Sequence, residues 1–310
     1  MSLNSEQAGR ASVTVQIRGG LGNQLFMYSM ARRLASANNV PLFLEVRSGF
    51  TKDFYKREYG LDRFNVIGSE VKQREYSKVR RAVSIGLNSL LPFSRRVSYH
   101  ETSQKFDHRY QDLRVRCPVY LYGYWQDERY FSDIREQLKS ELTLRGSRHA
   151  SSERLAQEMR GCEAVAVHLR MLHGVPAGSE QVLPGGKNLP VEYYQWAIEE
   201  IKRRVTAPKL YLFSDKREVP ASLISQLDVT RVASEGEDAT YEDIWLMSQC
   251  RHFVIANSTF SWWGAWLGRE ADSVVVSPST SEWVPIPKLP KEWNAIEWSQ
   301  SLEPQATLNG

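Results

Sequence analysis

HFVIANSTFSWWGAWLG, residues 252–268, contains a strand that is predicted to turn directly into a helix. It opens as a short apolar run rich in β-branched residues, typical of a buried strand, and FSWWGAWL continues as an aromatic helical run. Between them stand Asn257, Ser258 and Thr259, residue types that cap helices. A strand that turns directly into a helix points backbone N–H groups beyond the strand, where they favour an anion such as a phosphate. The alternative is an ordinary capped helix with an aromatic core face.

The N-terminal part of the chain has the same strand-to-helix organisation. VTVQI (13–17) alternates like a strand, GGLGNQ (19–24) follows as a turn, and LFMYSMARRLASA (25–37) has helical spacing. PLFLEV (41–46) is the next expected strand. Strand, glycine turn, helix and strand form a βαβ unit, which implies a parallel sheet.

Later segments extend this first alternation and then begin a second one. Residues 50–115 are irregular, and VYLYGYW (119–125) predicts a strand. ERYFSDIREQLKSEL (128–142) predicts a helix, and the polar GSRHASSE (146–153) predicts a linker. Beyond it we expect strands at 163–170, 209–215, 252–256 and 273–278, and helices at 191–204, 241–249 and 260–267. The predicted fold class is α/β, with two Rossmann-like doubly wound domains that face a cleft. We place them at residues 1–150 and 151–310, the second with a C-terminal tail able to pack back on the first.

Composition is that of an ordinary globular protein. The 310 residues are 42% hydrophobic and 25% charged, and no run approaches the roughly 18 apolar residues that span a bilayer. The polar N-terminus has no signal-peptide core, so we expect a cytoplasmic protein. The cysteines are odd in number and far apart, which favours buried free thiols at Cys117, Cys162 and Cys250. A net charge of +4 is too small to indicate nucleic acid as a partner.

Positive charge is concentrated in one segment. Residues 72–105 carry eight basic side chains and two acidic ones, and they enclose the apolar VSIGLNSLLPF (83–93). A basic, partly apolar segment can lie on an anionic membrane surface, here the inner face, or receive an anionic substrate. A solvated, irregular insertion is the alternative.

The glycine turn of the first βαβ unit is a candidate site. Gly20 and Gly22 provide backbone that could cradle a diphosphate. The turn is not the dinucleotide fingerprint, because Leu25 occupies the position where the third glycine belongs. The amide pair Asn23 and Gln24 is the more specific feature, with plain turn residues as the alternative.

Further polar residues follow the strands of the second domain. Alternation puts His168 and Arg170 on one face, and a guanidinium there could grip a phosphate with two hydrogen bonds. His173 follows in a loop and belongs to a residue type that titrates near neutrality. The carboxylates of Asp215 and Asp243 are either helix-dipole partners or readers of guanine. No cluster has metal-ligand spacing, so a metal is disfavoured.

Together these segments resemble the α-1,2-fucosyltransferases over most of the chain. The matching motifs are IRGGLGNQLFMYSMARRLA (17–35), LYGYWQDERYF (121–131), HLR (168–170), LPVEYYQWAI (189–198), LYLFSD (210–215) and MSQCRHFVIANSTFSWWGAWLG (247–268). The resemblance implies a GT-B fold and transfer of L-fucose from GDP-fucose to the 2-hydroxyl of a galactose, or a similar sugar, in a glycan acceptor. It also implies inversion at the sugar carbon and no metal or other cofactor.

The resemblance assigns roles to individual residues. Arg170 would neutralise the departing diphosphate, Asn23 and its turn would face the donor, and Asp243 would read guanine. The implied catalytic residues are Arg170, His168, Asn23 and His173. The implied donor-binding residues are Gly20, Gly22, Gln24, Asp215, Asp243, Asn257, Ser258, Thr259, Phe260 and Ser261.

One motif departs from the family pattern. After Arg170 the family's second arginine is Met171 here, its aspartate is His173 and its tyrosine is Gly174. His173 could act as the base, the base could lie elsewhere, or a dissociative transition state could need little base. Two other function classes stay open: a sugar-binding protein that has lost transfer, and a nicotinamide oxidoreductase, which Leu25 argues against.

Overall fold

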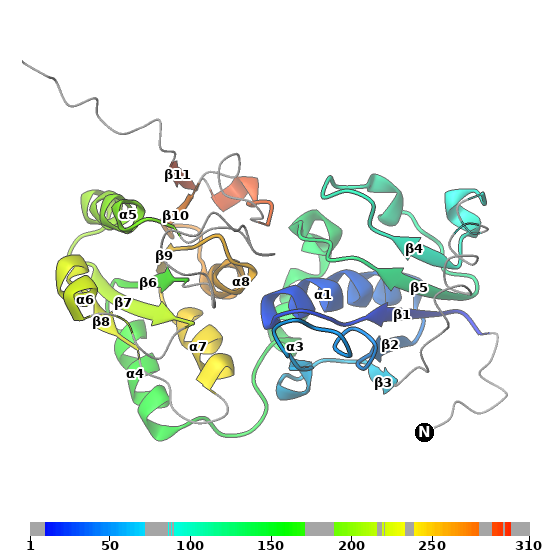
Figure 1. The fold of residues 1–310 in the computed structure, drawn as a ribbon, viewed down its shortest axis with the longest axis horizontal. Coiled ribbons are helices and arrows are strands. Elements are labelled where there is room, and N and C mark those ends of the chain that lie inside the picture. Colours follow the sequence, from blue (N-terminus) through cyan, green and yellow to red (C-terminus); the bar gives the residue numbers. More distant parts are fainter. Residues whose placement is uncertain are drawn as a thin grey trace, which may run out of the picture. The chain divides into compact units, whose positions relative to one another are not determined.

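The computed structural model describes residues 10–71, 86, 88, 90–170, 189–215, 219, 221–232, 239–278, 287–293 and 295–298 (Figure 1). The chain divides into two compact units, residues 1–145 and 146–310. Each is built on a sheet in which all the paired strands run parallel. The predicted fold class, two doubly wound α/β domains, is confirmed. That the domains face a common cleft stays a prediction.

The first unit has a five-stranded sheet in the order β3-β2-β1-β5-β4. Its strands are β1 (Ser12–Gln16), β2 (Leu42–Glu45), β3 (Ser69–Val71), β4 (Ser98–His100) and β5 (Pro118–Tyr122). Its helices are α1 (Leu21–Asn38) and α3 (Arg135–Glu141). Short 3-10 turns lie at Leu61–Arg63, Phe93–Arg95, His108–Tyr110, Glu128–Tyr130 and Ser132–Ile134.

Helix α1 is held by a buried polar contact as well as by its apolar face. The Tyr28 hydroxyl donates to the Glu141 carboxylate and accepts the Ile67 N–H at 2.9 Å. Arg32 pairs with the same carboxylate at 2.9 Å. Because Glu141 is buried, its charge needs both partners. The start of α1, which carries the glycine turn, therefore belongs to a helix tied to α3.

The second unit has a six-stranded sheet in the order β11-β10-β9-β6-β7-β8. Its strands are β6 (Ala164–Leu169), β7 (Lys209–Ser214), β8 (Thr230–Arg231), β9 (His252–Val254), β10 (Val275–Pro278) and β11 (Ile296–Trp298). Its helices are α4 (Ala150–Arg160), α5 (Val191–Arg204), α6 (Ala221–Leu227), α7 (Ala239–Met247) and α8 (Thr259–Gly268), with a 3-10 turn at Lys291–Trp293. Counted within the unit, the strand order is the 3-2-1-4-5-6 of a Rossmann sheet.

The aromatic helix α8 is a core element. Trp262, Trp263 and Trp266 are fully buried, as is Trp125 of the first unit, so core packing explains these four tryptophans. Helices α7 and α8 pack closely at glycines: a Cβ added at Gly264 would lie 2.9 Å from Met247 Cβ.

Several local predictions were wrong. Residues 128–142 do not form one helix, because Phe131, with φ −148°, separates the 3-10 turn at Glu128–Tyr130 from the turn at Ser132–Ile134 that leads into α3. The irregular segment 50–115 contains β3 and β4, each only three residues long. Helix α4 begins at Ala150, inside the expected linker. All three cysteines are free, but only Cys250 is buried. In the described part of the chain, no helix has the length and apolar character to cross a bilayer.

We predict that Gly268→Ala destabilises the second unit. A Cβ at this position would lie 2.6 Å from the Ser248 carbonyl oxygen and 2.8 Å from its Cα, so backbone would have to move. Overpacking of this kind costs about 1–3 kcal/mol of unfolding free energy, measurable by urea titration. The control is Gly161→Ala, whose Cβ would come no closer than 3.5 Å to its neighbours. Equal stability of the two variants would contradict the prediction.

Candidate functional site

The strand order of the second unit reverses between β6 and β9, which pair directly. In open α/β sheets ligands bind at such a reversal, outside the carboxyl ends of the strands. His168 lies near the end of β6 and Arg170 just beyond it, and Asn257 follows β9. The polar residues that the sequence singled out therefore lie at the switch point of the sheet.

Arg170 bridges this switch point. Its Nη1 donates to the Asn257 carbonyl oxygen at 3.2 Å, which joins the loop after β6 to the loop after β9. Arg170 is half-buried and Asn257 is buried. The bond fixes a planar cation beside the start of α8, where the helix dipole also favours negative charge.

The turn from β9 into α8 is built by its own hydroxyl groups. Ser258 caps α8, because its Oγ accepts the Phe260 N–H at 3.2 Å. Ser261 is fully buried, and its Oγ accepts the Ala256 N–H at 3.2 Å. These two serines shape the turn, whereas Thr259 and Phe260 are only half-buried.

A tyrosine of helix α5 supports the backbone that leads into the same turn. The Tyr193 hydroxyl donates to the Ile255 carbonyl oxygen at 2.5 Å. Tyr193 is fully buried, and it comes from the LPVEYYQWAI motif. This motif therefore reaches the candidate site by supporting the backbone ahead of Asn257.

His168 is a buried neutral imidazole. It is 3% exposed, and its ring centroid lies 5.7 Å from that of Phe260. Burial, with a smaller effect of the nearby Arg170 charge, lowers the pKa of His168 to about 3. Within the described residues its Nδ1 has no hydrogen-bond partner. A histidine with so low a pKa holds a proton poorly, so its place beside Phe260 indicates a positioning role.

The two candidate carboxylates of the second unit differ in setting. Asp215 is exposed directly after β7, and Asp243 is half-buried on α7. The neighbouring Glu242 is buried and accepts the His149 N–H at 2.8 Å and the Ser152 hydroxyl. Glu242 therefore anchors α4, and Asp243 is the acidic residue of this pair with exposed surface.

The glycine turn of the first unit starts helix α1. Gly19 has φ 73°, a left-handed conformation that favours glycine, and Gly20 precedes the helix without a side-chain cap. Gly22 is buried in the first turn. Gln24 is also buried, and its Nε2 donates to the carbonyl oxygens of Gly19 and Glu58 at 2.9 and 2.8 Å. The Gln24 amide thus holds the turn against the 58–60 loop.

Asn23 lies at the switch point of the first sheet. The strand order there reverses between β1 and β5, and Asn23 Oδ1 accepts the Gln126 Nε2–H at 2.9 Å. This bond joins the turn after β1 to the loop after β5. Sequence reasoning did not select Gln126 as a site residue, although it lies within the LYGYWQDERYF motif.

Two arginines accompany this turn and were also missed. Arg18 lies over the Tyr124 ring, with Cζ 4.5 Å from its centroid. Arg57 stacks on Tyr55, with its Cζ 4.3 Å from the ring centroid. Its Nε would lie 3.9 Å from a Cβ added at Gly20. Arg18 directly precedes the turn within the quoted motif at 17–35, which could have identified it, whereas Arg57 is distant in sequence and only the fold brings it to the turn.

The structure thus gathers most of the predicted residues at two switch points, one in each unit, whereas Asp215 follows β7 and Asp243 lies on α7. His168, Arg170 and residues 257–261 lie at one, and residues 20–24 lie at the other. His173 lies outside the described residues. Among the residues that the structure describes, no three His, Cys, Asp or Glu side chains group as metal ligands.

Residues 86–299 match glycosyl transferase family 11. The chain belongs to this family. The resemblance to α-1,2-fucosyltransferases is confirmed at family level, and the protein is a glycosyltransferase.

The named relatives match this family 11 chain over different shares of their own length. It is 26% identical to the α-1,2-colitosyltransferase of Escherichia coli, over 92% of this chain and 99% of the relative. It is 26% identical to the E. coli O-antigen biosynthesis glycosyltransferase WbnK, over 84% and 92% of the two chains. Human galactoside α-(1,2)-fucosyltransferase 1 is 29% identical over 64% of this chain and 57% of its own. Among solved structures, NodZ α-1,6-fucosyltransferase soaked with GDP-fucose covers 83% of this chain and 92% of its own, with 16% identity and a TM-score of 0.49.

We predict that His168 makes the family 11 chain sensitive to acid. Above pH 6.5 the imidazole is neutral in both the folded and unfolded states. Below pH 6.5 His168 binds a proton in the unfolded chain, whereas in the folded chain it does not bind one until about pH 3. Stability therefore falls as the pH drops, by about 2 kcal/mol between pH 6.5 and 5.

The measurement is urea unfolding across this pH range. His168→Gln should flatten the slope of unfolding free energy against pH, whatever its own stability. His108→Gln, a change at an exposed histidine, should keep the wild-type slope. A His168→Gln chain with the wild-type slope would show that His168 does not cause the acid sensitivity.

Proposed function

We propose that the protein transfers L-fucose from GDP-fucose to the 2-hydroxyl of a galactose, or a similar sugar, in a glycan acceptor. Transfer inverts the configuration at fucose C1 and needs no divalent metal. The observation that carries the proposal is Arg170, held against the Asn257 carbonyl at the switch point of the second sheet. Family membership and the names of the relatives support fucosyl or colitosyl transfer as the reaction class.

The reaction needs charge stabilisation where GDP leaves. The acceptor oxygen bonds to fucose C1 while the bond from C1 to the β-phosphate oxygen breaks, and GDP departs with the electron pair. In our proposal Arg170 and the start of α8 stabilise this charge, since a guanidinium and a helix N-terminus both favour phosphate oxygens. Thr259 and Phe260, the half-buried members of the turn, contact the donor, and Ser258 and Ser261 keep the turn in shape.

The guanine and fucose ends of the donor have separate candidate partners. Asp243 is proposed to accept the two adjacent N–H groups of guanine, and Asp215 to bind the donor at the end of β7. On the first unit, Asn23 and the Gly20–Gly22 backbone are proposed to face the sugar. The Oδ1 atom of Asn23 accepts a hydrogen bond from Gln126, so the Asn23 amide is fixed for this contact.

The acceptor hydroxyl must lose its proton. We propose His173 as the base, since it replaces the family's usual acid and neutral imidazole is competent near pH 7. His168 is a poorer candidate, because its pKa is near 3.

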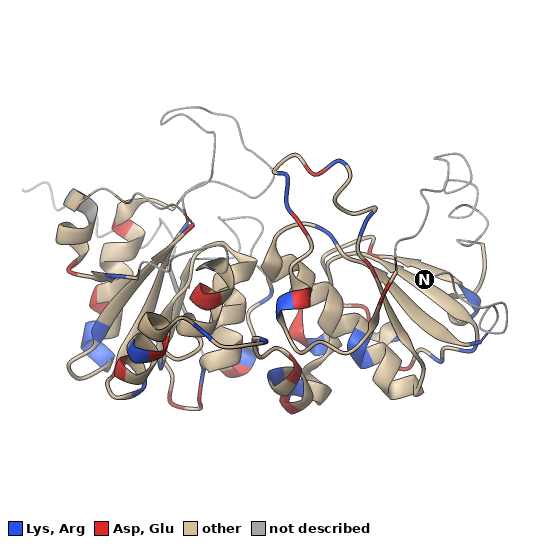
Figure 2. Ribbon diagram, turned by 90° about the horizontal axis from the view of Figure 1, so that it is seen from below, with Lys and Arg blue, Asp and Glu red and all other residues tan. Residues whose placement is uncertain are grey.

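Exposed apolar residues support peripheral contact with a membrane that carries a lipid-linked acceptor. Leu90, Leu91 and Val97 are 81%, 41% and 42% exposed, and the basic Arg95 and Arg96 lie between them in sequence. Exposed apolar side chains with basic ones between them suit an anionic lipid surface. On the helices of both units, basic residues (blue) and acidic residues (red) lie interspersed (Figure 2).

The deciding experiment measures GDP release with GDP-fucose and a panel of galactosides, each with and without EDTA. We expect acceptor-dependent release that survives EDTA, and a product linked to the 2-hydroxyl. GDP-colitose tests the donor, since a relative is named a colitosyltransferase. Faster turnover with GDP-colitose would reassign the donor. Binding of GDP-fucose without release for any acceptor would favour a sugar-nucleotide-binding protein, and activity restored only by magnesium or manganese would overturn the metal-free proposal.

Arg170→Ala should abolish turnover. Losing a charge positioned for the leaving diphosphate costs on the order of 3 kcal/mol, a factor of at least a hundred in kcat/KM. Arg170→Lys should not restore activity, because an ammonium cannot donate to two phosphate oxygens in the same planar geometry. Since Arg170 also braces Asn257, thermal unfolding of both variants is the control for loss of the turn. Near-normal kcat/KM in either variant would exclude this role.

His173→Ala tests the base. A positioned general base contributes about 10²–10⁴-fold, so kcat should fall by that order while GDP-fucose binding persists. The acidic limb of the pH–rate profile should also disappear, and His173→Asp should keep part of the activity. If KM for the acceptor rises while kcat and its pH dependence stay the same, His173 shapes the acceptor pocket instead.

A further inference from the structure

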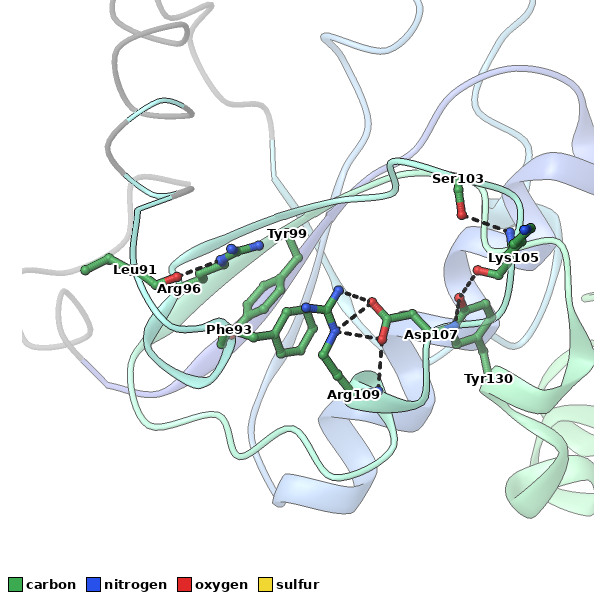
Figure 3. Close-up of polar contacts among 9 residues, drawn as sticks. All are labelled: Leu91, Phe93, Arg96, Tyr99, Ser103, Lys105, Asp107, Arg109 and Tyr130. Atoms are coloured by element: carbon green, nitrogen blue, oxygen red, sulfur yellow. Dashed lines mark hydrogen bonds and ion pairs between the residues drawn. The ribbon is translucent and has the colours of Figure 1, made fainter.

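A small pocket of the first unit lies outside the glycine turn. It opens beside the end of β4 and the 3-10 turn at His108–Tyr110, and its volume is about 70 Å³. Figure 3 shows part of its lining, with the rings of Phe93, Tyr99 and Tyr130 and the charged groups of Asp107 and Arg109. We call it the β4 pocket. Its size suits one small group rather than a whole glycan.

Both carboxylates of the β4 pocket are already engaged by the protein. Asp107 accepts from Arg109 Nε at 2.9 Å and from Arg109 Nη2 at 2.7 Å, as the dashed lines of Figure 3 show. This contact lowers the pKa of Asp107. Glu101 accepts the backbone N–H groups of Tyr124 and Trp125 at 2.6 and 3.1 Å. Neither carboxylate is therefore available to hold a cation.

The positive groups of the pocket are more available. Arg109 is fixed by Asp107 and by the Phe93 ring, whose centroid lies 4.3 Å from its Cζ, yet 60% of its side chain is exposed. The Lys105 ammonium is exposed and makes no hydrogen bond or ion pair with the residues that the structure describes. Arg96 also lines the pocket, with Nε donating to the Leu91 carbonyl oxygen at 3.1 Å.

We infer that the β4 pocket binds an oxyanion of the acceptor, either the carboxylate of an acidic sugar or a phosphate of a lipid carrier. Lys105 provides the positive charge that no carboxylate of the described residues pairs with, and Arg109 adds its Nη1 donor, because its Nε and Nη2 are bound to Asp107. The hydroxyls of Thr102 and Ser103 provide neutral donors on the same lining. The inference rests on the proposed function, since it names the acceptor class for that reaction.

A chain of contacts links this pocket to the glycine turn. Glu101 lines the pocket and holds the N–H groups of Tyr124 and Trp125. The next residue, Gln126, donates to Asn23. Three consecutive residues thus connect the pocket wall to the residue proposed to face fucose. An acceptor anchored in the β4 pocket would lie on the same unit as that turn.

The first experiment measures binding and does not depend on transfer. Glucuronate, inorganic phosphate and neutral glucose are compared by NMR titration of the full chain, with Lys105→Gln as the pocket variant and Lys139→Gln as a matched lysine change on α3. We expect glucuronate or phosphate to bind, glucose not to bind, and Lys105→Gln to weaken anion binding about tenfold. Lys139→Gln should bind like the wild type.

The second experiment identifies the source of the oxyanion. Three galactosides are compared as acceptors: a neutral one, one with a neighbouring glucuronate, and one carried on a lipid diphosphate. The charged acceptor that uses the pocket should have the higher kcat/KM, and Lys105→Gln should lower the ratio of charged to neutral kcat/KM about tenfold. Whichever arm shows the loss assigns the carboxylate or the phosphate.

Two outcomes would overturn the inference. One is anion binding that Lys105→Gln and Lys139→Gln affect equally. The other is a ratio of charged to neutral kcat/KM that Lys105→Gln leaves unchanged in both arms. Failure of the proposed function looks different, since no galactoside would then accept fucose while the NMR titration would still report on the pocket.

Discussion

The hydrogen bond from Arg170 to the Asn257 carbonyl closes the point where the second sheet changes direction. β6 leads to β7 and β8 on one side, and β9 leads to β10 and β11 on the other, so their loops diverge. Ser258, Ser261 and Tyr193 fix the backbone on the β9 side, and Arg170 ties the β6 side to it. A positive charge is thereby fixed in position before any ligand arrives, which is the preorganisation that electrostatic catalysis depends on.

The first unit solves the same topological problem with neutral groups. Its sheet reverses between β1 and β5, and the amides of Asn23 and Gln126 meet across the reversal. An amide pair offers directed hydrogen bonds without charge, which suits hydroxyl-rich sugar better than diphosphate. The two units therefore differ in the group that joins the loops at the reversal: an arginine does so in the second unit, and an amide pair does so in the first, where Arg18 and Arg57 lie beside the turn.

The sequence was informative wherever local pattern decides structure. The helix over Val191–Arg204 has the predicted bounds, and the Asn-Ser-Thr turn caps α8 as its residue types indicate. β3 and β4 were missed because a strand of three residues has no period to detect. Gln126, Arg57 and Lys105 were missed for another reason: each acquires its setting from loops distant in sequence, which spacing along the chain does not reveal. His168 was found, but its neutrality follows from burial that the motif alone does not show.

Trp125 occupies the left-handed region, with φ 47°, where a non-glycine residue stores on the order of 1–3 kcal/mol of strain. Full burial of the indole and the hydrogen bond from the backbone N–H of Trp125 to Glu101 compensate for this cost. The kinked backbone delivers Gln126 to Asn23. Thermodynamic linkage follows from this geometry. If a ligand that displaces Glu101 changes the free energy of the Gln126–Asn23 contact, a ligand at Asn23 must change the free energy of the Glu101 contacts by the same amount.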